Sequence, residues 1–418
     1  MVKENILRVW LIISQSNPQE YSAYLKNIFS IFERKNNINI QEEYVTWERV
    51  LTALIDAFKK NTAPDVIMIG TSWLRTFAHM GYLDQVPDWV DFKPSINEKI
   101  NEICKYNESY CAVPWIVDTI IMAGRKDYMS KLDISRDDVK DWRGLNETVK
   151  RITELRKKDP NLPRPISLAF KRENDTIQRF FSLLWSQGWD FPDIRGIPEK
   201  IINDPFVIDQ LKYFANLKII NESSEAKIKV HPYEVNEEFY EYGESVFYIG
   251  SWYAIVDKIN EAEWEGKSEK PVANYCILPF PASSGERSVS YGGGTTLAVS
   301  ASSSKKETAW KLVEHLINDE IIRKFDIGNV PAFDGAFWQK RYEDERVKLM
   351  YEQTLNSKVF PVHPAWISIE NQIINAVGSI LLNLVTKRSA ELEEKDYSLL
   401  KNTDQNIKKI LKMSWEMK

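Results

Sequence analysis

An indole, a carboxylate and a hydroxyl stand close together after one proline: Trp115, Asp118 and Thr119 follow Pro114. Such groups are costly to bury without hydrogen-bond partners, and a polar ligand supplies partners of that kind. Proline lacks the N–H that a central strand needs, so Pro114 predicts a break between two extended segments and a crossover between two lobes. Asp118 also has a structural interpretation, as a partner of Arg125, but its closeness to Trp115 favours ligand contact.

The chain holds 14 tryptophans, and several stand where strands are expected to end or helices to begin: Trp10, Trp47, Trp73, Trp115, Trp185, Trp189, Trp252 and Trp366. In open α/β sheets the carboxyl ends of the strands face the ligand crevice, so rings placed there form flat apolar walls. The C–H faces of sugar rings stack on such walls. Any single tryptophan is better explained as a core residue. The group as a whole favours a carbohydrate site.

Catalytic chemistry has no positive support in the sequence. Ser-His-Asp, Cys-His and Gly-x-Ser-x-Gly signatures are missing, so we expect no catalytic residue. A carboxylate pair such as Asp118 and Glu244 would suit a glycoside hydrolase, but a sugar-binding site also uses carboxylates as hydrogen-bond acceptors. The four histidines share no metal-like spacing with each other or with the cysteines. We therefore expect neither a metal nor another cofactor.

Three glycines in a row, residues 292–294, resemble a phosphate-binding turn at first sight. They lack the following Lys-Ser/Thr of a P-loop, and they lead into the strand pattern TTLAV rather than into a helix. The triplet therefore predicts a close approach of the backbone to ligand or to another lobe, with a flexible turn as the alternative. The three cysteines cannot all pair: Cys104 and Cys111 are close enough to bridge a small loop, and three free buried thiols are the alternative.

Length and composition set the broad class. A chain of 418 residues exceeds one ordinary core, and about 150 residues per domain gives two or three domains. The net charge of −5 provides no basic field for nucleic acid, which we exclude as a partner. No apolar run approaches the roughly 20 residues of a membrane span. The N-terminus lacks the pattern of a signal peptide, which fits either a cytosolic protein or a mature secreted domain whose export or lipid signal a starting Met has replaced.

The hydrophobic pattern predicts strands that alternate with helices. Strands are expected at residues 6–14, 38–45, 65–70, 246–249, 275–279 and 295–299, and helices at 21–35, 48–60, 141–158, 174–187, 204–217, 237–242, 307–318 and in most of the chain from 343 onward. Thr71 and Ser72 follow the third strand, in position to cap the next helix. This alternation indicates an α/β protein with parallel sheets.

The order of these segments, taken with five short sequences, resembles the extracellular solute-binding proteins of ABC sugar importers, which include maltose-, trehalose- and oligosaccharide-binding proteins. The sequences are APDVIMIGTSW (63–73), AVPWIVDT (112–119), GESVFYIGSW (243–252), GGGTTLAV (292–299) and GNVPA (328–332). The resemblance implies a two-lobed periplasmic-binding-protein-like fold with a hinge and an interlobe ligand cleft. By analogy one lobe holds residues 1–113 and 290–334, and the other 114–289 and 335–418.

The resemblance also implies a function without catalysis: the protein binds a sugar, closes on it and delivers it to the permease of an ABC transporter. Family contact positions carried onto this chain are Trp10, Ser14, Gln15, Trp47, Thr71, Ser72, Trp73, Trp115, Asp118, Ser251, Trp252, Gly293, Gly294 and Trp366. We expect a monomer outside the cell membrane or in the periplasm, lipid-anchored in its full-length precursor. Two other functions stay open, a glycoside hydrolase and a binding protein for a non-sugar solute such as a peptide.

Overall fold

The computed structural model describes residues 5–13, 18–220, 229–240, 242–252, 274–283, 287–318, 330–335, 338–339 and 343–416. The chain forms two compact units: unit 1 comprises Met1–Asp118 and Gly293–Tyr342, and unit 2 comprises Thr119–Gly292 and Glu343–Lys418. The chain passes from unit 1 to unit 2 inside strand β6 (Val113–Arg125) and returns inside strand β10 (Gly292–Val299). The assignment of these units as the two lobes of a receptor stays a prediction.

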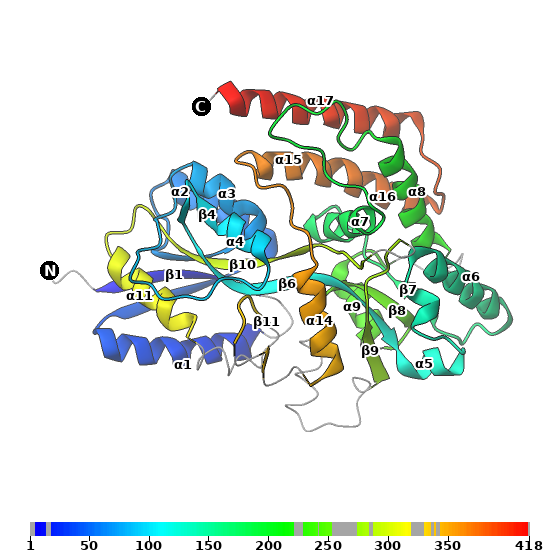
Figure 1. The fold of residues 1–418 in the computed structure, drawn as a ribbon, viewed down its shortest axis with the longest axis horizontal. Coiled ribbons are helices and arrows are strands. Elements are labelled where there is room, and N and C mark those ends of the chain that lie inside the picture. The colour runs from blue at the N-terminus through cyan, green and yellow to red at the C-terminus, as the bar shows by residue number, and fades with distance from the viewer. Residues whose placement is uncertain are drawn as a thin grey trace. The chain divides into compact units, whose positions relative to one another are not determined.

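The sheet of unit 1 is built on three strands that the sequence pattern predicts, β1 (Ile6–Ile13), β2 (Asn39–Thr46) and β3 (Val66–Gly70). β1 pairs in parallel with both β2 and β3, and β10 pairs with β3 in the antiparallel sense. The other elements are α1 (Pro18–Asn36), α2 (Trp47–Lys59), α3 (Thr71–His79), α4 (Glu98–Cys104), β4 (Lys105–Tyr106), β5 (Ser109–Tyr110), α11 (Lys306–Leu316) and β11 (Val330–Pro331) (Figure 1). Every residue of β3 is buried, as expected for an apolar strand inside a sheet.

Unit 2 contains the second part of β6 together with β7 (Arg164–Ser167), β8 (Ser245–Ser251) and β9 (Tyr275–Leu278). β7 and β8 are parallel, whereas β6 pairs antiparallel with β8 and with β9. The helices are α5 (Lys126–Lys131), the 3-10 turn η1 (Asp137–Val139), α6 (Trp142–Lys158), α7 (Asn174–Ser186), α8 (Pro205–Ile219), α9 (Pro232–Tyr240), α14 (Glu345–Leu355), α15 (Trp366–Ile373), the π-helical turn η3 (Ile374–Gly378), α16 (Ser379–Lys387) and α17 (Glu394–Glu416).

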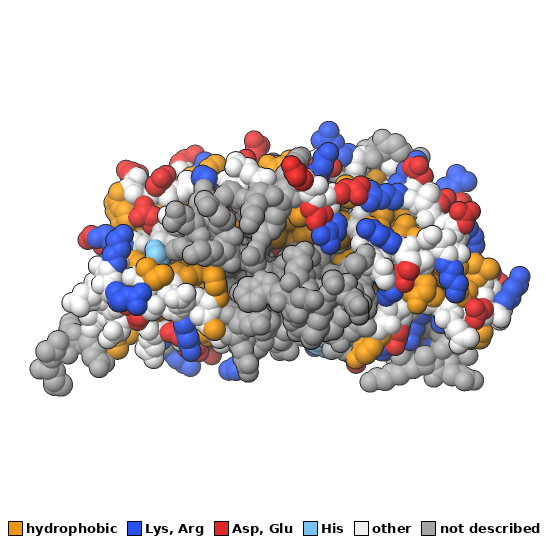
Figure 2. All heavy atoms as spheres, turned by 90° about the horizontal axis from the view of Figure 1, so that it is seen from below, with side chains coloured by type: hydrophobic (Ala, Val, Ile, Leu, Met, Phe, Trp, Pro, Cys, Tyr) orange, Lys and Arg blue, Asp and Glu red, His pale blue; other side chains and the backbone are white. Residues whose placement is uncertain are grey.

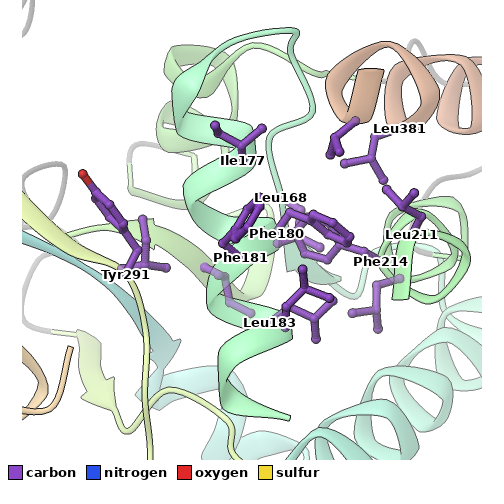
Figure 3. Packing of buried hydrophobic residues seen from close by; sticks show 14 of the residues in the cluster. Leu168, Ile177, Phe180, Phe181, Leu183, Leu211, Phe214, Tyr291 and Leu381 are labelled. Carbon is purple, nitrogen blue, oxygen red and sulfur yellow. The ribbon is translucent and has the colours of Figure 1, made fainter. Parts of the chain in front are cut away.

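The hydrophobic core of unit 2 surrounds α7, whose apolar residues face several neighbouring elements. Figure 3 shows Phe180 of α7 close to Phe214 of α8, and the ring centroids of these two residues lie 5.9 Å apart. Leu211 of α8 and Leu381 of α16 belong to the same buried cluster. Because α7 is buried on most of its circumference, including its polar residues Arg179 and Ser182, it is a central helix of this unit rather than a surface helix.

Four local predictions are wrong or incomplete. The sheets are mixed rather than parallel, because β10, β9 and β11 pair in the antiparallel sense. Pro114 does not break the chain into two extended segments: it is the second residue of the 13-residue strand β6, where a missing N–H is tolerated. The N-cap of α3 is Gly70, so neither Thr71 nor Ser72 caps that helix. The alternative of a flexible turn at the triple glycine is wrong, because residues 292–294 are part of β10.

Charged side chains of both signs are interspersed over the described part of the face seen in Figure 2. This mixture agrees with the small net charge of −5. Among the described residues, no helix combines the length and the apolar character that a transmembrane segment needs.

Candidate functional site

In unit 1 the carboxyl ends of two parallel strands lead directly into helices. β2 ends at Thr46 and α2 begins at Trp47, while β3 ends at Gly70 and α3 begins at Thr71. Both strands run parallel to β1, so their carboxyl ends lie at the same edge of the sheet. Ligands of open α/β sheets bind outside this edge.

The structure brings together two predicted site residues, Trp47 and Trp73, at this edge. Their ring centroids lie 5.9 Å apart and their planes are 62° apart, an edge-to-face arrangement. Trp47 is 43% exposed and Trp73 only 6%. A Cβ added to Gly70 would lie 3.3 Å from Cε3 of Trp73 and 3.4 Å from Cζ3 of Trp47. The two rings thus form an apolar wall that a side chain larger than glycine at position 70 would crowd, and Trp47 offers the exposed part of it.

Backbone donors lie beside this wall, because α2 and α3 both begin there. Neither N-cap residue, Thr46 or Gly70, makes a side-chain capping bond to its helix. The first turn of a helix carries N–H groups without intrahelical partners and a partial positive charge, so it favours oxygen acceptors. Thr71 is buried and Ser72 is half-buried in the first turn of α3. The edge therefore combines an apolar wall with hydrogen-bond donors, the combination that a sugar requires.

The other predicted residues of unit 1 lie in different environments. Trp10 is half-buried inside β1, opposite Glu43 of β2 and Ile67 of β3, and is not at the strand end. Trp115 is buried in β6, and Asp118 is half-buried three residues further along the same strand. Ser14 and Gln15 lie outside the described residues.

The structural interpretation of Asp118 as a partner of Arg125 is wrong. The two residues lie seven positions apart on one extended strand, a span of roughly 23 Å at about 3.3 Å per residue. Arg125 instead forms a bidentate pair with Asp127, with Nη2–Oδ2 at 2.6 Å and Nε–Oδ1 at 2.9 Å. Thr119, which the sequence also marked as a polar group in need of a partner, has one within its unit, because its hydroxyl donates to the carbonyl of Tyr291 at 2.9 Å.

Gly293 and Gly294 both lie in β10, and Gly294 has a clear packing reason to be glycine. Its φ is +135°, and an added Cβ would lie 1.9 Å from the carbonyl oxygen of Ile116 in β6. The predicted close approach of the backbone is therefore to another strand of the same unit. The next residue, Thr295, is a candidate that the sequence reasoning missed: it is 2% exposed, and its hydroxyl has no hydrogen-bond partner in the described part of the chain.

In unit 2 the predicted residues Ser251 and Trp252 lie at the carboxyl end of β8. Ser251 is half-buried and pairs with Ile120 of β6, and the N–H of Trp252 donates to the carbonyl of Thr119 at 2.9 Å. Trp252 is 4% exposed, and within the described residues its Nε1 has no hydrogen-bond partner. Among the described residues, Nε1 of Trp185 and Nε1 of Trp366 are also buried without a partner, so what distinguishes the unused donor of Trp252 is its position directly after β8.

Trp366, at the start of α15, belongs to an aromatic cluster of unit 2. Its ring stacks on Phe360 at 5.3 Å and meets the edge of Phe191 at 5.5 Å. Trp185 and Trp189 are in the same cluster through Phe181, at 5.7 and 5.9 Å. Trp366 is 1% exposed, so packing is its observed role.

The cysteines are buried thiols, and Glu244 is held in ion pairs. Cys104, Cys111 and Cys276 are free and buried. Burial raises the pKa of Cys111 to about 11 and also raises the pKa of Cys104, so their thiols stay protonated near neutral pH. Glu244, one half of the glycosidase pair considered above, forms ion pairs with Lys229 at 3.1 Å and Arg164 at 3.9 Å. In the described part of the chain no group of three or more His, Cys, Asp or Glu could hold a metal ion.

Comparison with known proteins gives one family match. Residues 15–321 match the family described as bacterial extracellular solute-binding protein. The chain is 21% identical over 382 residues to the maltotriose-binding protein of Pyrococcus abyssi (strain GE5 / Orsay), covering 89% of this chain and 75% of that protein.

Two solved structures have the same fold. One is an ABC transporter solute-binding protein from Thermotoga lettingae bound to α-D-tagatose, with a TM-score of 0.79, 20% identity and coverage of 97% of this chain and 100% of that one. The other is maltose-bound MalE3 of T. maritima, with a TM-score of 0.75, 20% identity and coverage of 96% and 99%. At this level of identity the structures establish the α/β binding-protein fold.

Proposed function

Because the chain belongs to the bacterial extracellular solute-binding protein family, we propose that it is a carbohydrate receptor that delivers an oligosaccharide to the permease of an ABC transporter. The observation that carries the choice of a sugar is the wall of Trp47 and Trp73 beside two helix N-termini. Flat rings suit the C–H faces of a sugar, and backbone N–H groups suit its hydroxyl oxygens. The sugars named for its relatives, maltotriose, maltose and tagatose, support the same class.

Ligand contacts in this proposal fall on both units. In unit 1 we assign them to Trp47, Trp73 and the first turn of α3, with Trp10, Trp115, Asp118, Gly293 and Gly294 as further candidates. In unit 2 we assign them to Ser251 and Trp252, because both lie at the carboxyl end of β8 and the buried indole N–H of Trp252 has no partner among the described residues. Trp366 is a further candidate in unit 2, although its ring is buried within the aromatic cluster of Phe360 and Phe191.

A thermal-shift screen tests the proposal. The purified protein is mixed with maltose, maltotriose, longer maltodextrins, tagatose and a set of short peptides, and the sugars are examined for cleavage afterwards. Binding to the native state alone at about 100 times Kd adds roughly 2.7 kcal/mol to the free energy of unfolding. A raised Tm with an intact sugar supports the receptor. Cleaved sugar would favour a glycoside hydrolase, and a response to peptides alone would identify a peptide-binding protein.

Three finer points belong to the same proposal. We propose that the protein is a monomer, which light scattering after gel filtration tests. We also propose that the native precursor carries a lipid anchor, which mass spectrometry of the protein from its own membranes tests. The hinge motion expected from the family resemblance stays a prediction, and a fall in the radius of gyration on addition of a bound sugar would confirm it.

A further inference from the structure

The unpaired hydroxyl of Thr295 is the strongest candidate for an unassigned polar contact in unit 1. Two consecutive threonines of β10, Thr295 and Thr296, differ in the hydrogen bonding of their hydroxyls. The hydroxyl of Thr296 donates to the carbonyl oxygen of Ile69 at 3.3 Å. The hydroxyl of Thr295 has no hydrogen-bond partner in the part of the chain that the structure describes, although Thr295 is only 2% exposed. An unsatisfied buried hydroxyl costs roughly 1–3 kcal/mol of stability. A native structure that keeps such a hydroxyl therefore indicates that a bound ligand supplies the missing hydrogen-bond partner.

Strand register shows which way Thr295 points. It stands directly opposite Gly70 in the antiparallel pair of β10 and β3. Directly opposed residues of an antiparallel pair place their side chains on the same face of the sheet. A Cβ atom built on Gly70 would lie 3.3 Å from Cε3 of Trp73 and 3.4 Å from Cζ3 of Trp47, so this face of the sheet is the one that the two rings cover. The hydroxyl of Thr295 therefore lies on the face of the sheet that carries the indole wall.

The first turn of α3 begins next to this pair, because Gly70 is its N-cap. Gly70 has no side chain with which to cap the helix, and the first turn of the described helix contains no acidic residue. The partial positive charge of a helix N-terminus favours an oxygen that can accept hydrogen bonds. Thr295 provides a group beside it that both donates and accepts.

We propose that the hydroxyl of Thr295 and the N-terminus of α3 together hold one polar oxygen of the solute, at the edge of the Trp47–Trp73 wall. This inference rests on the proposed function. The polar oxygen is then a hydroxyl of the sugar ring that stacks on Trp47. Thr295 is then a specificity residue: a sugar that presents a hydroxyl there satisfies a buried group, and a sugar without it leaves that group unpaired.

The test compares two isosteric variants, Thr295→Val and Thr296→Val, that differ in whether a hydrogen bond is lost within the protein. Without ligand, Thr296→Val should lower the Tm by roughly 1 °C or more, because it removes a bond to Ile69. Thr295→Val should leave the Tm unchanged or raise it, since it removes an unpaired buried hydroxyl. An equal fall in Tm for both variants would overturn the proposal, because Thr295 would then have a structural partner.

Binding is measured by calorimetry with maltotriose and with every other sugar that raises the Tm of the wild-type protein. Thr295→Val should weaken binding at least tenfold, Thr296→Val less than threefold, and Thr295→Ser, which keeps the hydroxyl, less than threefold. One monodeoxy derivative of the bound sugar should bind equally to the wild type and to Thr295→Val. Unchanged affinity of Thr295→Val for every bound sugar would overturn the proposal.

The outcome also separates this inference from the proposed function. If peptides bind and sugars do not, the sugar receptor is wrong, and the peptide affinity of Thr295→Val decides the role of Thr295 by the same tenfold criterion. If no probe binds, the Tm values of the two valine variants still test the premise. A fall in the Tm of Thr295→Val equal to that of Thr296→Val would show that the hydroxyl of Thr295 has a hydrogen-bond partner within the protein and would overturn the proposal.

Discussion

Replacing Trp47 by alanine should weaken sugar binding about tenfold without unfolding the protein. Trp47 is 43% exposed and meets Trp73 edge to face. A tryptophan side chain offers up to about 250 Å², so about 110 Å² of Trp47 faces solvent and is open to a ligand. At about 25 cal/mol per Å², complete coverage of that area by a sugar would contribute roughly 2.7 kcal/mol. One sugar face covers about half of it, which gives roughly 1.4 kcal/mol, or a factor of ten in Kd.

Trp89 provides a matched control, because it is also a tryptophan of unit 1 and is 46% exposed. Trp89→Ala removes a similar exposed apolar area, and Trp89 follows Leu83, which bridges Ser300 next to the Val299–Val66 pair at the amino end of β3. Isothermal calorimetry with maltotriose, or with the sugar that gives the largest rise in Tm, compares both variants with the wild type. Urea unfolding measures the stability that Trp47→Ala loses, which is up to roughly 3.5 kcal/mol for the buried 140 Å² or so of the side chain and roughly 0.5–1.5 kcal/mol more for the contact with Trp73.

Two results would refute the reasoning about Trp47. If Trp47→Ala and Trp89→Ala bind the sugar with Kd values within twofold of each other, exposed indole area at the strand ends has no special role. If the free energy of unfolding of Trp47→Ala falls by clearly more than roughly 5 kcal/mol, the ring is mainly structural and its exposed face is not available as a binding surface.

Three further predictions address other residues. Trp252→Ala should weaken sugar binding more than tenfold with the far-ultraviolet circular dichroism intact; unchanged affinity would remove Trp252 from the site. Gly294→Ala should lower the free energy of unfolding by more than about 2 kcal/mol, because its Cβ would meet the carbonyl of Ile116 at 1.9 Å. Gly81→Ala, with a φ of +71° and no atom within 4 Å of its Cβ, should lose only about 1 kcal/mol in urea unfolding. Burial lowers the pKa of His315, so the unfolded chain takes up this proton first and stability should fall as the pH drops below about 6.5. The His315→Gln variant should lose that part of the pH dependence of urea unfolding, and an unchanged slope between pH 7.5 and 5 would contradict this.

The sequence alone was sufficient to locate most helices and strands of both units. The run VIMIG in β3 and the helical spacing of apolar residues in α2 depend on local periodicity, which the structure confirms. The family resemblance also followed from the order of such local segments, and the match of residues 15–321 confirms it. Local signals failed where two strands meet: the sense of β10 and the continuity of β6 through Pro114 depend on partners far away in the chain.

The candidate site was predictable in residue type but not in arrangement. Tryptophans at strand ends were visible in the sequence, and Trp47 and Trp73 do lie together. Trp366 has the same sequence signal, yet it packs inside an aromatic cluster. Thr295 had no signal of its own, because the sequence does not distinguish it from Thr296, whose hydroxyl is paired. Strand register makes the difference, because it pairs Thr295 with Gly70, and a Cβ atom on Gly70 would contact the rings of Trp47 and Trp73. Only the folded chain fixes that register.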